Sequence, residues 1–236
     1  MTPQHRDRWM QVFLAQARGP VRNGELMLQS MARALHDQAV KEGRPPPMND
    51  YVIETLIVVV DALDALNIVY AVTGSVASAV HGEPFSSMDA DLVVLASAAQ
   101  AAKIAELLQP RFYAPVDMFV DAQQRHSFAN VVDQHTSAKV DLSFVGDDPY
   151  LNEVLQRRVL GNIGKAARQF WLVTPEDVIL MKLLWRKDTR SAKQWENALS
   201  VARVQGARMD WKYLFDRARR LGVENDLIAL RDEAGI

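Results

Sequence analysis

The chain has 236 residues, of which 49% are hydrophobic and none is cysteine, so it can bury a core but excludes disulfides, thiolate nucleophiles and cysteine-bound zinc. Its net charge of -2 at pH 7 excludes a whole-chain attraction to nucleic acid or anionic membrane. The longest apolar run, LIVVV at 56–60, is much shorter than a membrane span, and the first residues lack the apolar core of a signal peptide. We therefore expect a cytoplasmic protein without a membrane partner.

The N-terminal segment shows apolar residues at helical spacing over 4–18 and 24–42, followed by EGRPPPMND. Proline lacks an N–H and cannot continue a helix, so the three prolines indicate a boundary. We predict an N-terminal helical extension at 1–46, a core at 47–173 and a C-terminal helical region at 174–236. The pattern leaves three roles open for the extension: packing on the C-terminal helices, forming a homodimer, or remaining poorly ordered.

The core is predicted to alternate helices and strands. A helix from 50 to about 67 precedes a strand at 68–73, a short helix that opens at Gly74, a strand at 89–96 and a helix at 97–109. Two strands joined by the turn DQHTS occupy 127–145, and another strand lies at 169–173. Helices are expected at 175–187, 191–205, 210–221 and 223–233. This order predicts an α+β fold with helical flanks.

Asp89 and Asp91 stand at the start of the strand DADLVVLA. Residues two apart in a strand point to the same face, so both carboxylates project together. Like charges this close repel, and ionising both requires a cation or ample solvent. Carboxylates on a rigid strand suit Mg²⁺ or Mn²⁺, with substrate phosphates as further ligands. An isolated D-x-D is nevertheless more often a pair of solvated acids, so the metal interpretation requires further support.

Two other features supply that support. Gly74 and Ser75 follow a strand and open a helix, where glycine permits close approach and free N–H groups can receive a phosphate. Asp141 interrupts an apolar strand, SAKVDLSFV. If that strand lies beside the strand of Asp89 and Asp91, Asp141 is a third carboxylate at one metal cluster; otherwise it is an edge-strand acid. Phosphates at the Gly-Ser turn and metals at three carboxylates would together describe two-metal nucleotidyl transfer.

These residues resemble the polymerase-beta-like nucleotidyltransferase superfamily, and within it a group of small bacterial proteins of the nucleotidyltransferase fold. The similar segments are GSVASAVHGEP, DADLVV, SFANVVDQHTSAKVDLSFVGDDPY, TPEDVILMKLLW and SAKQWENALSVARVQG, which span about residues 50 to 232. The resemblance implies a mixed β-sheet flanked by helices and transfer of an NMP from an NTP such as ATP to a hydroxyl, with release of pyrophosphate. It implies Asp89, Asp91 and Asp141 as the catalytic and metal-binding residues.

The resemblance further implies nucleotide binding by Gly74, Ser75, Ser87 and Lys182. For Lys182, the alternative is an aliphatic stem that carries its ammonium out of the core. Two positions depart from the expected pattern, because Phe85 replaces an arginine and Asn197 replaces an acid. These departures motivate an alternative in which the fold is kept as a binding or regulatory module with weakened catalysis.

The acceptor is expected to be RNA, a protein or a small molecule. Residues 182–220 contain eleven Lys and Arg against four Asp and Glu, which is typical of a wall that contacts phosphates or RNA. The alternative is a solvated basic face that pairs with acids elsewhere. Superfamily relatives include toxins of toxin-antitoxin systems, but no feature of this sequence indicates that role.

Overall fold

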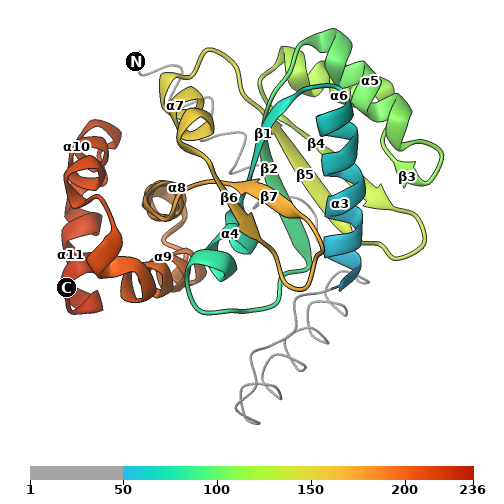
Figure 1. The fold of residues 1–236 in the computed structure, drawn as a ribbon. Helices are drawn as coiled ribbons and strands as arrows, with labels where there is room; N and C mark the ends of the chain where they lie inside the picture. The colour runs from blue at the N-terminus through green and yellow to red at the C-terminus, as the bar shows by residue number, and fades with distance from the viewer. Residues whose placement is uncertain (1–49) are drawn as a thin grey trace.

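The computed structural model describes residues 50–236 (Figure 1), so the helices expected at 4–18 and 24–42 lie outside the described residues. A seven-stranded sheet crosses the described part of the chain, in the order β3-β4-β5-β2-β1-β7-β6. Its strands are β1 (Val69–Thr73), β2 (Asp89–Leu95), β3 (Phe112–Tyr113), β4 (Phe128–Asp133), β5 (Lys139–Phe144), β6 (Val159–Asn162) and β7 (Gln169–Leu172). The pairs β2–β5 and β1–β7 are parallel and the other neighbours antiparallel, which confirms the predicted mixed sheet.

Helices cover both faces of the sheet, as Figure 1 shows. One face carries α3 (Asp50–Ala65), α5 (Ala98–Leu108) and α6 (Val116–Gln124). The other carries α4 (Gly74–His81), α7 (Pro149–Arg157), α8 (Pro175–Thr189) and α9 (Ala192–Gln205), with the short helix η1 (Gly206–Arg208) and then α10 (Trp211–Leu221) and α11 (Glu224–Ala234) beyond them. The α+β class and the helical C-terminal region are confirmed.

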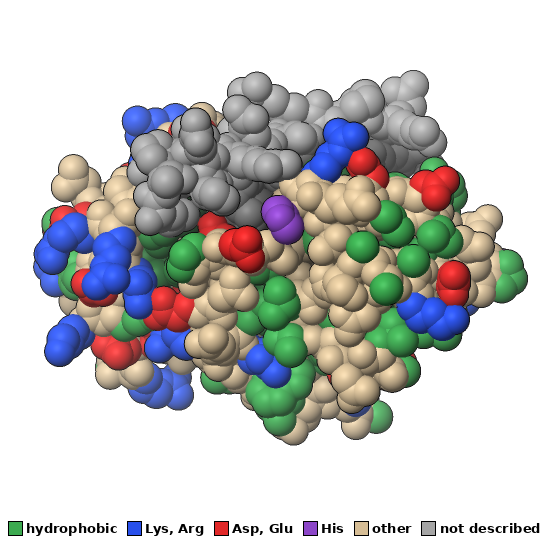
Figure 2. Space-filling view, turned by 90° about the horizontal axis from the view of Figure 1, so that it is seen from above, with side chains coloured by type: hydrophobic (Ala, Val, Ile, Leu, Met, Phe, Trp, Pro, Cys, Tyr) green, Lys and Arg blue, Asp and Glu red, His purple; other side chains and the backbone are tan. Residues whose placement is uncertain are grey.

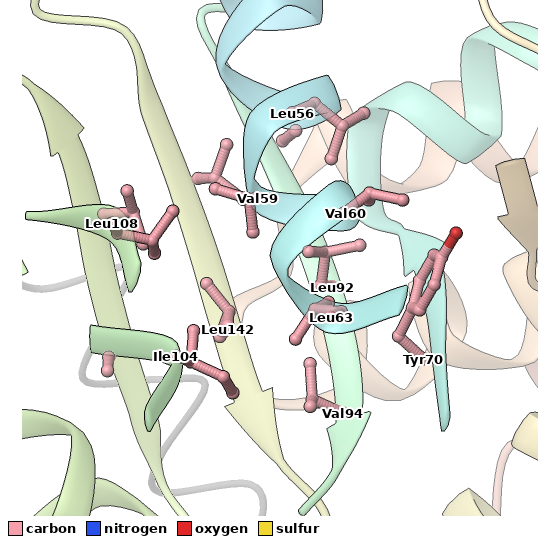
Figure 3. Packing of buried hydrophobic residues seen from close by; sticks show 14 of the residues in the cluster. Leu56, Val59, Val60, Leu63, Tyr70, Leu92, Val94, Ile104, Leu108 and Leu142 are labelled. Atoms are coloured by element: carbon pink, nitrogen blue, oxygen red, sulfur yellow. The ribbon is translucent and has the colours of Figure 1, made fainter. Parts of the chain in front are cut away.

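The core on the α3 face forms because alternate residues of the central strands are apolar. Val59 and Leu63 of α3 pack against Leu92 of β2 and Leu142 of β5 (Figure 3), and all four are fully buried. Burying each such side chain contributes about 1.5–3 kcal/mol. Since Leu92 points to this face, its neighbour Asp91 must point to the opposite one.

The second core lies on the opposite face and joins the C-terminal helices to the sheet. Ala71 of β1 and Val93 of β2 belong to one buried cluster with Ile179 and Leu183 of α8. The C-terminal helices are therefore packed on the same face of the sheet from which Asp89 and Asp91 project. No helix between residues 50 and 236 has both the length and the apolar character needed to cross a bilayer.

Side chains cap two of the predicted helices. The Ser97 side chain accepts the N–H of Gln100 in a capping box at α5, and Thr174 accepts the N–H of Asp177 at α8. Five elements of the described residues were not predicted, namely β3, α6, α7, β6 and η1. The helix α7 did carry a local signal, because Asp148 caps it and Pro149 occupies its first position.

Candidate active site

Strand register brings the three predicted carboxylates together. In the parallel pair β2–β5, Asp91 lies opposite Asp141 and Asp89 lies opposite Lys139. In the antiparallel pair β1–β2, Asp91 lies opposite Thr73, the last residue before Gly74. The strand of Asp141 thus adjoins the strand of Asp89 and Asp91, which is the arrangement that the predicted carboxylate cluster requires. The edge-strand alternative for Asp141 does not hold, because β5 lies between β2 and β4.

Gly74 is in contact with the Asp91 carboxylate. Its φ of +63° lies in the left-handed region, which only glycine adopts without strain. A Cβ added to Gly74 would lie 1.9 Å from Oδ2 of Asp91, inside any permitted contact. The glycine is thus required both by the turn from β1 into α4 and by the approach of Asp91.

Replacing Gly74 with alanine is expected to destabilise the protein by more than the same change at Gly235. Both residues have positive φ, but a Cβ at Gly235 meets nothing within 4 Å. The Gly235→Ala variant therefore measures the backbone cost alone, about 1 kcal/mol. The extra loss in Gly74→Ala reports the clash with Asp91. Urea unfolding of both variants measures the difference, and equal losses would show that Asp91 moves aside at no cost.

The start of α4 offers unpaired N–H groups. Gly74 and Ser75 are both buried, and no side chain caps the helix, whose N-cap residue is Thr73. Ser78 lies one turn further on and donates its hydroxyl to the Gly74 carbonyl at 2.9 Å. The first N–H groups of α4 therefore remain free of side-chain acceptors, as a phosphate-binding turn requires.

Asp89 and Asp91 differ in environment. Asp89 has a side chain that is 41% exposed, and it accepts the Ser87 hydroxyl at 3.1 Å. Asp91 is half-buried, and the burial of its carboxylate, followed by the charges of Asp89 and Asp141, raises the pKa of Asp91 to about 7. Ser87 thus orients a carboxylate, and its predicted contact with the nucleotide stays a prediction.

Asp141 is held by two neighbours that the sequence reasoning did not name as functional. Lys139 Nζ lies 2.9 Å from Oδ2 of Asp141 and 4.0 Å from Oδ2 of Asp89. The Asn130 amide of β4, opposite Asp141 in register, donates to Oδ1 of Asp141. Burial raises the pKa of Asp141, and the Lys139 charge opposes that rise. The sequence could have indicated Lys139, because alternation in the strand places it on the face of Asp141. Asn130 could be identified only from the pairing of its strand with the strand of Asp141.

Lys182 is buried in α8, with only 2% of its surface exposed. Its ammonium lies 4.9 Å from the centre of the Trp185 ring. Burial lowers the pKa of Lys182 to about 8, while the charge of Asp91 acts in the opposite direction. The alternative in which the stem carries the ammonium into solvent is therefore wrong. Lys182 belongs to the electrostatic surroundings of the carboxylates, and nucleotide contact stays a prediction.

Asp89 and Asp91 are the carboxylates that could hold a divalent ion. Within residues 50–236, no three His, Asp or Glu side chains are grouped closely enough to hold a metal by themselves. Asp89 and Asp91 share one face, however, and the pKa of Asp91 is raised first by burial and then by the negative charges of Asp89 and Asp141, which a cation would offset. Two carboxylates with substrate phosphates are a usual Mg²⁺ ligand set. Participation of Asp141 in metal binding stays a prediction.

Four of the eleven basic residues at 182–220 form ion pairs with acids. Ion pairs join Arg186 to Asp226, Arg217 to Glu153, Arg219 to Glu224 and Arg220 to Asp216. Figure 2 shows Lys and Arg interspersed with Asp and Glu on the side of the molecule that carries α10 and α11. At these four positions the pairings fit the solvated basic face, and contact of the other basic residues with RNA stays a prediction.

The two departures from the expected pattern lie near α4 and in α9. Phe85 is partly buried in the segment between α4 and β2. Asn197 of α9 is 8% exposed, and its amide nitrogen has no hydrogen-bond partner. The helix α9 also contacts the segment after α4, because Ser200 accepts the Glu83 N–H at 2.7 Å. Both departures therefore lie on segments that adjoin the C-terminal end of α4.

Comparison with solved structures supports the fold. An antigenic nucleotidyltransferase-like protein from Paracoccidioides brasiliensis is 19% identical, with a TM-score of 0.47, and the match covers 79% of this chain and 94% of that one. The antibiotic-resistance factor ANT(2'')-Ia in solution is 14% identical, with a TM-score of 0.50 and coverage of 77% and 100%. Its complex with adenylyl-2''-tobramycin is 16% identical, with a TM-score of 0.47 and coverage of 71% and 97%. No protein-family model and no curated protein matches the sequence.

Proposed function

We propose that this chain is a nucleotidyltransferase that moves an NMP from an NTP, such as ATP, to a hydroxyl acceptor and releases pyrophosphate. The observation that carries the proposal is the meeting of Asp89, Asp91 and Asp141 on one face of adjoining strands, beside the turn at Gly74. The fold shared with ANT(2'')-Ia supports the reaction class. The acceptor is RNA, a protein or a small molecule, and the comparisons do not choose among them.

In the proposed reaction, the acceptor oxygen attacks the α-phosphorus of the NTP. A new P–O bond forms, and the bond from the α-phosphorus to the bridging oxygen breaks, with the electron pair leaving on pyrophosphate. The acceptor proton passes to a carboxylate, for which Asp141 is our candidate. Asp89 and Asp91 would hold Mg²⁺ or Mn²⁺, which when bound neutralises phosphate charge and orients the triphosphate.

The other residues have positioning roles in this proposal. The free N–H groups at Gly74 and Ser75 would receive phosphate oxygens. The buried ammonium of Lys182 would face negative charge from the triphosphate, which raises its pKa again and keeps it protonated. Ser87 holds Asp89 through its hydroxyl and would thereby fix the direction of that carboxylate.

Calorimetric titration with Mg²⁺ and a non-hydrolysable NTP analogue tests the proposal. We expect binding that depends on the metal and disappears in the double variant Asp89→Ala plus Asp91→Ala. Asp232→Ala provides a control, because the Asp232 side chain is 67% accessible. This variant should bind the nucleotide analogue as the wild type does. The proposal fails if the wild type binds no nucleotide, or if the double variant binds as well as the wild type does.

A second function is a nucleotide-binding regulatory module with weak or no turnover. The unpaired amide of the buried Asn197 favours it, because the expected pattern places an acid there. This module would bind the Mg²⁺–NTP pair but leave an α-labelled NTP unchanged in the presence of RNA, protein and small-molecule acceptors. Any labelled product that requires Asp89 and Asp91 decides for the enzyme.

A further inference from the structure

We propose that Lys139 acts as a built-in cation at this site, so that the site takes one divalent ion with its triphosphate instead of two. This inference rests on the proposed function and specifies how the site binds metal. It concerns a residue that occupies the space between two carboxylates, Asp89 and Asp141, on the face from which a nucleotide would approach.

The position of Lys139 follows from the strand register. Lys139 lies directly opposite Asp89 across the β2–β5 pair, and it precedes Asp141 by two residues on the same strand. Alternation in the strand therefore places its side chain on the same face as Asp141. Its ammonium lies 2.9 Å from Asp141 and 4.0 Å from Asp89, so that it supplies positive charge to both carboxylates.

Asp141 already has a partner on each carboxylate oxygen. Oδ2 is within 2.9 Å of Lys139 Nζ, and Oδ1 accepts the Asn130 amide. The Asp141 side chain is 4% exposed, so water cannot readily replace either partner. A metal ion binding Asp141 would have to displace the ammonium, and removing one partner of a buried ion pair leaves a charge without compensation.

Repulsion by the Lys139 ammonium also favours a single ion. A second divalent ion would lie beside the Lys139 ammonium and be repelled by it, since like charges at this separation oppose each other strongly in a partly buried site.

Counting Mn²⁺ ions by electron paramagnetic resonance tests the inference in the full chain, with a non-hydrolysable ATP analogue present. We expect one bound Mn²⁺ per chain in the wild type and no Mn²⁺–Mn²⁺ dipolar coupling. In Lys139→Met, which keeps the length of the stem but removes the charge, we expect a second Mn²⁺ and dipolar broadening. Adding Asp141→Asn to Lys139→Met should return the count to one, because it removes the freed ligand.

The outcomes separate this inference from the proposed function. Two Mn²⁺ ions in the wild type, or one ion in both wild type and Lys139→Met, would overturn the role of Lys139 alone. If no Mn²⁺ binds to the wild type, the proposed function is overturned, and this inference with it. Lys139→Gln serves as a second variant if Lys139→Met does not fold, and thermal unfolding monitored by circular dichroism checks the fold of each.

Discussion

Replacing Asp177 with alanine is expected to lower the free energy of unfolding by about 3–5 kcal/mol, the range found when one partner of a buried charged network is removed. Asp177 lies in the first turn of α8 and is fully buried. Its carboxylate accepts the Tyr213 hydroxyl at 2.7 Å, the Thr174 hydroxyl at 2.8 Å and the Arg157 Nε–H at 3.3 Å. Alanine would leave these donors without their acceptor. Urea unfolding followed by tryptophan fluorescence measures the loss.

Asp177→Asn provides the matched comparison, because it removes the charge but keeps one acceptor oxygen. Burial raises the pKa of Asp177, so the ionised form is costly in the fold, while Tyr213, Thr174 and Arg157 offset that cost. We therefore expect Asp177→Asn to lose less than half as much stability as Asp177→Ala. Similar losses in both variants would show that the charge, and not the set of hydrogen bonds, stabilises this junction.

Replacing Asp91 with asparagine is expected to weaken metal-dependent nucleotide binding by about 100-fold or more, comparable to the loss of one preorganised electrostatic contact in an enzyme site. The reason is that Asp91 and Asp89 supply the two carboxylates proposed for the metal, and an amide oxygen carries no charge. Calorimetric titration with Mg²⁺ and the NTP analogue measures the affinity. Asp232→Asn, at an exposed acid, should bind as the wild type does.

Replacing Asp91 with asparagine is also expected to raise the melting temperature of the metal-free protein. The pKa of Asp91 rises in the fold to about 7, from about 3.9 for a free aspartate, so the fold favours the protonated carboxyl. The stability that protonation contributes is complete below about pH 4 and is lost as the pH rises towards 7. The gain in Asp91→Asn should therefore be larger at pH 8 than at pH 5, measured in EDTA. An equal gain at both pH values would contradict this electrostatic reason.

The sequence predicted most of the core because its local patterns agree with the tertiary structure. Ser97 and Thr174 cap the helices predicted at 97–109 and 175–187, and the alternation of DADLVV places Asp89 and Asp91 opposite a wholly apolar face. The short edge elements were missed because they carry little pattern. The strand β3 spans only two residues, and β6 lies at the sheet edge with Val159 and Leu160 exposed.

The surroundings of the site could be predicted only in part. The position of Asp141 beside Asp91 depends on which strands pair. It could therefore be predicted from the sequence only on the condition that their two strands are neighbours. Asn130 reaches Asp141 from β4, eleven residues away, so its role follows from cross-strand register and not from any local signal. The burial of Lys182 is likewise set by the packing of α8 on the sheet, because a lysine stem can equally extend into solvent.

The helix α8 links stability and site chemistry within a single element. Its first turn carries Asp177, which joins α8 to α7 and α10 through Arg157 and Tyr213, and its middle carries Lys182. Its apolar residues pack directly against β1 and β2. Recombination that exchanged α8 would remove part of the sheet's covering layer and the buried ammonium in one step.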